Sequence, residues 1–164
     1  IIMYPAVSIE RALAAMKRRT PGELLGRYTD RDLDTFIQRD KEAWRPAGIY
    51  AVWAYPAVEA TDQAPELEKK SYEQIQTRPG VQGFNFRELA IFSLWHYWET
   101  GRPLDTKTVS LSGTLDADGG ALRGSWNDDM FCAYWYGQRY SYPHLCARRI
   151  VLPTPVSPKA DPAA

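Results

Sequence analysis

The chain has 164 residues, of which 45% are hydrophobic and 24% charged, and its formal net charge is +0. The length and composition favour a single globular domain with a sizeable core. The balanced charge argues against binding of nucleic acid or of an acidic membrane surface through overall charge. No apolar run reaches the length of a transmembrane helix and no signal-peptide pattern is seen, so we expect a cytoplasmic protein with no membrane partner.

The first 46 residues show the apolar spacing and capping residues of three helices. Ser8 can cap the first helix, and residues 20–23 form a capping box with proline at the first helical position, which predicts a second, short helix through residues 24–25. A third helix is predicted from near Thr29 to before Pro46. The apolar stripes of the first and third helices are Ile9, Ala12, Leu13 and Met16, and Leu33, Phe36, Ile37 and Trp44.

Residues 47–55 change to a short run of β-branched and aromatic side chains that Pro56 ends, which predicts a buried strand. A polar connection over 56–65 follows. A helix is then predicted from about residue 66 to residue 77, and a loop over 78–83.

The strongest helix signal lies between Phe84 and Gly101. Asn85 can cap this helix and Glu88 can complete a capping box, while Gly101 suits the left-handed residue that ends a helix. The residues between them leave almost no polar face, so we predict a core helix over 85–99 that is buried on nearly all sides. An aromatic groove for a ligand is the alternative interpretation of the same residues.

After residue 108 the apolar residues alternate with polar ones, which is typical of strands. Strands are predicted over 109–115, 121–126, 130–137 and 144–152. Because short turns join them, they favour an antiparallel meander. We therefore predict an α+β fold in which N-terminal helices and one buried core helix pack on a C-terminal antiparallel β-meander. Residues 1–152 would form this single domain, and the Pro/Ala-rich segment 153–164 is predicted to be disordered.

Residue types that could carry catalysis are present but scattered. His96 lies inside the core helix and His144 begins the last strand. Four aspartates lie in two turns, namely Asp116, Asp118, Asp128 and Asp129. These groups could serve a small enzyme as acid–base pairs, although a packed histidine and ordinary turn aspartates are the simpler interpretation.

Cys132 and Cys146 lack metal-ligand spacing, so no metal is expected. They could face each other if their strands are neighbours, and a pair of free thiols is the preferred interpretation. No phosphate-binding loop is present, and we expect no cofactor.

The segment from residue 131 to 149 is the best candidate for a functional surface. A strand with large aromatic side chains on both faces cannot bury all of them unless both faces are covered, so some should form a contact surface. The candidate binding residues are Tyr134, Trp135, Tyr136, Arg139, Tyr140, Tyr142 and Arg148. We expect a small non-enzymatic binding protein whose partner is another protein rather than a sugar. A sheet covered on both faces is the alternative, a small enzyme is the competing class, and the oligomeric state is left open.

One segment is similar to part of a known family. Leu122-Arg-Gly-Ser-Trp-Asn127, followed by Cys132 and by Ala147-Arg148, resembles the closing segment of C-type-lectin-like and formylglycine-generating-enzyme-like domains. The resemblance implies a carbohydrate-binding module. The spacing to Cys132 differs by one residue from the lectin pattern, and the family's central Gly-Asn-Val-Trp-Glu-Trp-like stretch is missing. No binding residue is therefore carried over.

Overall fold

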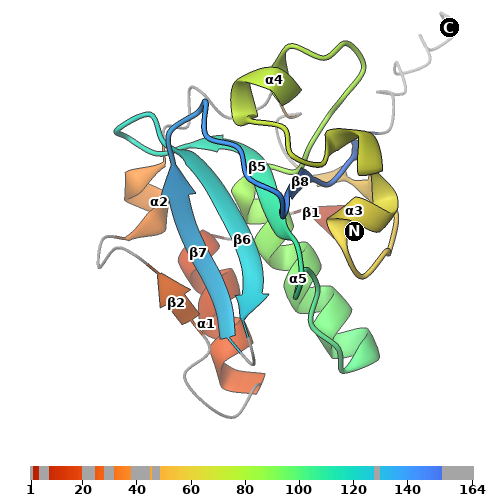
Figure 1. Ribbon diagram of the computed structural model, residues 1–164. Coiled ribbons are helices and arrows are strands. Elements are labelled where there is room, and N and C mark those ends of the chain that lie inside the picture. The colour runs from red at the N-terminus through yellow and green to blue at the C-terminus, as the bar shows by residue number, and fades with distance from the viewer. Residues whose placement is uncertain are drawn as a thin grey trace, which may run out of the picture.

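The computed structural model describes residues 2–3, 8–19, 25–27, 32–37, 45, 49–127 and 130–152. It confirms the α+β fold, with a core helix lying across a sheet (Figure 1). The predicted disorder of residues 153–164 lies outside the described residues.

The central sheet has the order β2 (Leu25–Arg27), β7 (Met130–Tyr136), β6 (Ala121–Asn127), β5 (Val109–Leu115) and β8 (Leu145–Ala147). Within it, β5, β6 and β7 form the predicted antiparallel meander, with Ser110 opposite Gly124 and Ser125 opposite Cys132. Two small sheets pair β1 (Ile2–Met3) with β3 (Tyr50–Ala51), and β4 (Trp53–Ala54) with β9 (Ile150–Val151).

The sequence prediction was wrong for both edge strands of the central sheet, β8 and β2. The predicted fourth strand is split into β8 and β9, and β8 runs parallel to β5 instead of antiparallel to β7. The chain leaves β7 and crosses the end of the sheet, so it joins the far edge (Figure 1). At the other edge, residues 25–27 form β2, which includes Leu25 of the predicted second helix, because the edge of β7 supplies backbone partners that a local helix signal cannot outweigh. Residues 20–24 of that helix are not described.

Helix α5 (Phe86–Thr100) has the predicted ends. The Asn85 side chain accepts from Glu88 N at 2.9 Å, and Glu88 Oε2 accepts from Asn85 N at 2.8 Å, which completes the capping box. Gly101 has a φ of 68°, and its N–H donates to Tyr97 O. Only glycine adopts this left-handed conformation without strain, so the helix stops there.

The burial of α5 is less complete than predicted. Leu89 and Phe92 are buried, and the Phe92 ring stacks on Phe84 at a centroid distance of 5.1 Å. Trp95 and Trp98, however, are 39% and 46% exposed. One stripe of the helix therefore faces away from the sheet, and the prediction of a helix buried on nearly all sides is wrong there.

The remaining helices are short. They are α1 (Ile9–Arg19), α2 (Leu33–Phe36), α3 (Ala60–Gln63), the 3-10 helix η2 (Pro65–Leu67) and α4 (Tyr72–Gln76). Of the predicted third helix, residues 33–36 form α2 and Ile37 bridges to Asp116, while residues 29–31 and 38–44 lie outside the described residues. The predicted helix over 66–77 is replaced by η2 and α4. The predicted buried strand over 47–55 is also wrong in part, because Trp53 and Tyr55 are exposed while Val52 is buried.

The two faces of the sheet are covered differently. One face packs on α5 in the main core, which includes Leu89, Leu122 and Phe131. On the other face, a second core formed by α3, η2 and α4 covers β5 and β8. Among the described residues, no helix packs on β7 on that face, and the candidate site lies there.

Candidate ligand-binding site

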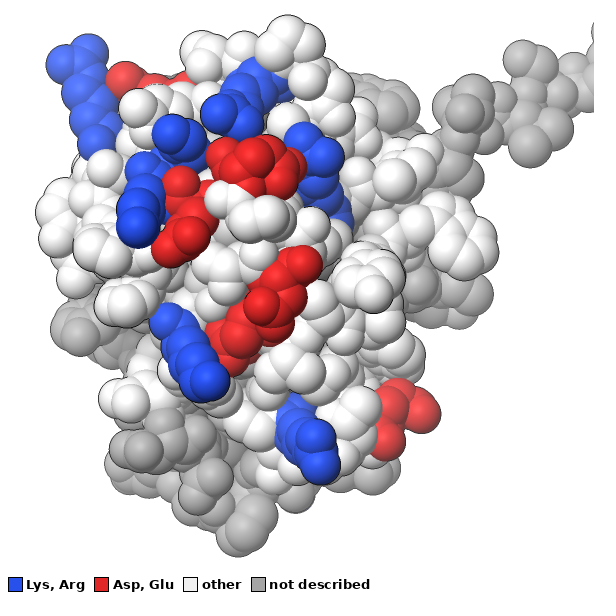
Figure 2. All heavy atoms as spheres, turned by 45° about the vertical axis from the view of Figure 1, so that its right-hand side comes forward, with Lys and Arg blue, Asp and Glu red and all other residues white. Residues whose placement is uncertain are grey.

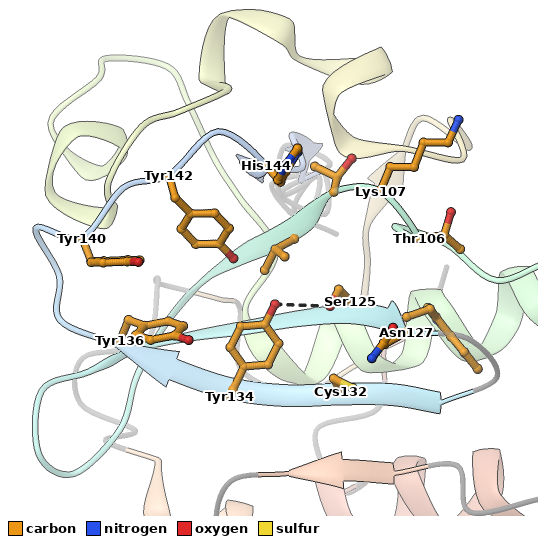
Figure 3. Close-up of a pocket in the computed structure, with 13 residues that line it drawn as sticks. Thr106, Lys107, Ser125, Asn127, Cys132, Tyr134, Tyr136, Tyr140, Tyr142 and His144 are labelled. Atoms are coloured by element: carbon orange, nitrogen blue, oxygen red, sulfur yellow. Dashed lines mark hydrogen bonds between the residues drawn. The ribbon is translucent and has the colours of Figure 1, made fainter.

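The uncovered face carries the polar side chains of β6 and β7. Since side chains alternate across a strand, and Leu122 and Trp126 belong to the main core, Arg123, Ser125 and Asn127 face the other side. Cys132, Tyr134 and Tyr136 of β7 lie on that same side (Figure 3). Together with the loop after β7, these strands enclose a pocket of about 450 Å3, which we call the tyrosine pocket.

Four tyrosine rings form a continuous row along the tyrosine pocket. Tyr136 stacks on Tyr140 with centroids 4.9 Å apart, Tyr134 meets Tyr136 edge-on at 5.9 Å, and Tyr142 follows Tyr140 at 5.6 Å. The hydroxyls of Tyr134 and Tyr142 point toward the middle of the hollow (Figure 3). Burial raises the pKa of both tyrosines, so these hydroxyls stay protonated at neutral pH.

The loop between β7 and β8, which carries Tyr140 and Tyr142, is held at both ends. Glu73 N of α4 donates to Gln138 O at 3.3 Å, and the Gln138 amide donates to Gly119 O at 2.9 Å. At the far end, Val109 N of β5 donates to His144 O at 2.7 Å. These two backbone hydrogen bonds and the one from the Gln138 side chain position the ring row before any ligand arrives.

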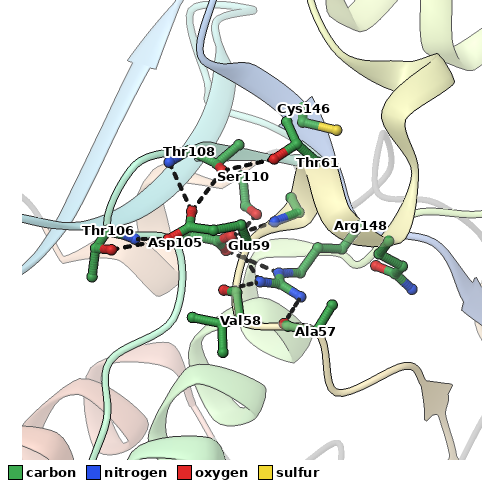
Figure 4. Close-up of polar contacts among 12 residues, drawn as sticks. Ala57, Val58, Glu59, Thr61, Asp105, Thr106, Thr108, Ser110, Cys146 and Arg148 are labelled. Carbon is green, nitrogen blue, oxygen red and sulfur yellow. Dashed lines mark hydrogen bonds and ion pairs between the residues drawn. The ribbon is translucent and has the colours of Figure 1, made fainter.

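Glu59 fixes the opposite rim, which consists of residues 106–108 (Figure 4). Its carboxylate accepts hydrogen bonds from the backbone and hydroxyl of Thr108, the backbone and hydroxyl of Thr106 and the backbone of Lys107. Burial by itself would raise the pKa of Glu59, but these donors outweigh it and hold the pKa below its usual value. The rim is thus tied to an anion that stays ionised.

Arg123 lies under the tyrosine row and is fully buried. The carbon of its guanidinium is 4.8 Å from the Tyr136 centroid and 5.4 Å from those of Tyr140 and Tyr142. Its Nη2 donates to Tyr140 O at 3.3 Å, whereas Nε and Nη1 have no hydrogen-bond partner. Burial lowers the pKa of Arg123, and Tyr142 partly offsets this effect. A buried cation held mainly against aromatic rings therefore lies behind the tyrosine row, although Arg123 does not itself line the pocket.

Arg148, a predicted binding residue, is not on the surface. It is 1% exposed and forms a two-pronged ion pair with Asp105, with Nε–Oδ2 and Nη2–Oδ1 distances of 2.9 and 2.7 Å (Figure 4). It also donates to the carbonyls of Ala57 and Val58, both at 2.8 Å. Arg148 thus ties the segment before α3 to the strands, which is a structural role that its sequence position did not reveal.

The other predicted binding residues are divided between two faces. Tyr134, Tyr136, Tyr140 and Tyr142 line the tyrosine pocket. Trp135 points to the other side and packs against the main core. Arg139 is on the surface beside the pocket, where it pairs with Glu73 at 3.2 Å. The structure therefore brings the four tyrosines together and separates Trp135 and Arg148 from them.

The groups proposed for an enzyme do not converge in the described part of the chain. His96 is buried and its Nδ1 donates to Arg102 O at 3.0 Å, and burial lowers its pKa. Asp116 is also buried, and its Oδ1 accepts from the backbone of Asp118 and Gly120, as a turn aspartate does. His144 lies at the rim of the tyrosine pocket. Asp128 and Asp129 lie outside the described residues.

The two cysteines are free and lie on strands separated by β6 and β5, so the expectation that they could face each other is wrong. Cys132 lies in the tyrosine pocket, where burial raises its pKa. Cys146 is buried, and burial raises its pKa to about 12. Neither thiol is activated as a nucleophile.

Sequence reasoning missed Arg123, Glu59 and the rim at residues 106–108. A signal for Arg123 was present, because Arg123, Ser125 and Asn127 alternate with apolar residues along a predicted strand. Nothing local marks Glu59, whose partners lie 47 to 49 residues away.

No protein-family model, no curated protein and no solved structure matches this chain. Within the described residues, no helix has the length and apolar character to span a membrane. The same residues contain no cluster of three or more histidine, cysteine or acidic side chains that could hold a metal ion. Acidic and basic side chains are interspersed on the face that Figure 2 displays.

Proposed function

We propose that this chain is a non-enzymatic binding protein whose ligand enters the tyrosine pocket. The observation that carries the proposal is the row of four tyrosines beside a hollow of about 450 Å3, which lies in the size range of small-molecule sites. Tyr136 and Tyr140 are 43% and 49% exposed although they stack on each other. A ligand that covered these rings would bury apolar surface at little cost in side-chain entropy.

The shape of the site favours a small ligand over the flat protein contact that the sequence suggested. A hollow lined by rings, hydroxyls and one amide can enclose a compact molecule on several sides. A single side chain of a partner protein could fill the same space, so a protein partner is the second candidate. A sugar stacked on Tyr136 or Tyr140 is the third, and the resemblance to lectin-like domains has no support from the comparisons beyond that stacking surface.

The preorganisation of the site supports binding rather than catalysis. Both rims are held by hydrogen bonds, and the pKa of Cys132 is raised rather than lowered. Among the described residues that line the tyrosine pocket, His144 has no acidic neighbour to orient it as a base. A site whose rims are held in place before the ligand arrives favours binding, because less ordering is then needed when the ligand binds.

Protein-observed NMR titration tests this proposal. A panel of aromatic acids, aromatic amines, neutral aromatic amides and mono- and disaccharides would be added to the 15N-labelled chain. We expect the amide signals of Ser125, Asn127 and Tyr136 to shift. Tyr140→Ala should weaken binding, whereas Tyr55→Ala, which removes a more exposed tyrosine outside the pocket, should not. Shifts confined to the surface around Trp53 and Tyr55 would contradict the proposal.

A further inference from the structure

The charge of Arg123 is not balanced by a carboxylate in the described structure. The side chain is 0% exposed, and two of its three nitrogens lack a hydrogen-bond partner. A guanidinium stays protonated in proteins, so its positive charge persists in this buried position. The tyrosine rings around it lower the cost of burial but carry no net charge.

Two other arginines of the same chain show the usual arrangement. Arg148 forms a bidentate ion pair with Asp105. Arg45 forms an ion pair with Glu88, with an Nη2–Oε2 distance of 2.7 Å. In both cases a carboxylate neutralises the guanidinium and satisfies its donors. Arg123 instead donates to the Tyr140 carbonyl at 3.3 Å and otherwise interacts with the tyrosine rings and with the side chain of Tyr142, which is not a carboxylate. It is the exception among these three.

The residues that line the tyrosine pocket do not offset the positive charge of Arg123. Among the described residues that line it, none is acidic, and Lys107 is exposed at the rim, near His144 (Figure 3). Glu59 lies behind the rim with its oxygens occupied by backbone and threonine donors. A cation entering the pocket would be repelled by the charge of Arg123. An anion would be attracted.

We propose that the tyrosine pocket binds ligands in which a planar ring carries an anionic group, either a carboxylate or a phosphate. The ring would stack on the exposed faces of Tyr136 and Tyr140. The anion would lie near the protonated hydroxyls of Tyr134 and Tyr142 (Figure 3). The guanidinium carbon of Arg123 is 5.4 Å from the centroid of the Tyr142 ring. This inference rests on the proposed function, since it names the class of ligand for the same site.

The test uses one ring with different charges. Benzoate, phenyl phosphate, neutral benzamide and cationic benzylammonium would each be titrated into the 15N-labelled chain. If the anionic group of the probe lies about 7 Å from the Arg123 guanidinium, at an effective dielectric constant of about 20, the attraction between them raises the affinity more than tenfold. We expect benzoate or phenyl phosphate to bind at least about tenfold more tightly than benzamide, and benzylammonium to bind most weakly. The tighter of the two anions identifies the carboxylate or the phosphate as the preferred group.

Two variants assign the preference to Arg123. Arg123→Met keeps the length of the side chain and should abolish the difference between benzoate and benzamide while both still shift the pocket signals. Arg139→Met removes one positive charge from the exposed neighbouring loop and should leave the difference intact. Thermal melts would show whether each variant is folded, and the comparison of the probes on the unmodified chain does not depend on either variant.

The outcomes separate the two proposals. Equal affinity of all four probes at the tyrosine pocket would overturn the anion preference and leave the binding function standing. Tightest binding of benzylammonium would also overturn it, since the pocket would then act as an aromatic cage for cations. If no probe shifts Ser125, Asn127 or Tyr136, both proposals fail.

Discussion

Thr108 donates two hydrogen bonds to one carboxylate oxygen of Glu59. Glu59 Oε2 accepts from the Thr108 backbone N–H at 2.9 Å and from its hydroxyl at 2.6 Å. The two residues are 49 positions apart, and the contact fixes one rim of the tyrosine pocket against the segment that precedes α3. A single buried anion therefore links the fold to the shape of the candidate site.

This contact predicts a pH-dependent loss of stability. Because the pKa of Glu59 is lower in the folded chain, its contribution is complete above the ordinary glutamate pKa of about 4.3. It is lost as the pH falls from there through the lower folded value. Glu59→Gln should lower the free energy of unfolding by about 1–3 kcal/mol at pH 7, and this difference should shrink in acid. Urea unfolding of both proteins over a pH series measures it, and a difference independent of pH would argue against the assignment.

Breaking the buried Arg148–Asp105 ion pair should cost much more stability than breaking an exposed ion pair. Asp105→Ala leaves Arg148 buried without its carboxylate and should cost about 3–5 kcal/mol. The matched control is Glu66→Gln, which breaks the half-exposed pair of Glu66 with Arg149 and should cost less than about 1 kcal/mol. Denaturant unfolding measures both. Equal losses would mean that Asp105 is accessible to water.

Neighbouring residues on β7 should respond in opposite ways. Trp135 packs against the main core, so Trp135→Ala should cost about 3 kcal/mol of stability. Tyr136 lies on the other face and is partly exposed, so Tyr136→Ala should cost only about 1 kcal/mol while it removes ligand binding. Thermal melts beside the NMR titration separate the two effects. A stable Trp135→Ala variant would place the tryptophan on a free surface.

Along α5, alanine substitution of an exposed residue should cost less stability than alanine substitution of a core residue. Phe92→Ala removes a fully buried ring stacked on Phe84 and should lower stability by about 3–5 kcal/mol. Trp95 is 39% exposed, so Trp95→Ala should cost clearly less. Unfolding by guanidinium chloride would rank them. The reverse order would mean that Trp95 is covered in solution.

The sequence predicted best where the signal is local. The capping box of Asn85 and Glu88 and the left-handed Gly101 involve residues within a few positions of each other, and all three are found as expected. The strands of the meander followed from alternation and turn residues. The positions of β2 and β8 could not be predicted in this way. Each is set by the free edge of a strand more than 30 residues away in the chain.

The candidate site was predicted only in part for the same reason. The composition of residues 131–149 identified the tyrosines, and the alternation of β7 implied that Trp135 and Tyr136 point to opposite faces. Whether both faces are covered depends on where α3, η2 and α4 dock. Arg148 was assigned to the surface because its partner Asp105 is 43 residues away.

By itself, the sequence determined the α+β class, the core helix with its ends, the meander and the concentration of tyrosines near its last strand. Only the tertiary structure decided that no described helix covers the tyrosine side of β7, that Arg123 lies under the tyrosine row without a described counter-charge, and that Glu59 holds the facing rim. The physical reason is the distance along the chain over which each interaction acts. Caps and alternation depend on backbone geometry over a few residues, whereas burial and charge pairing depend on which distant segments meet.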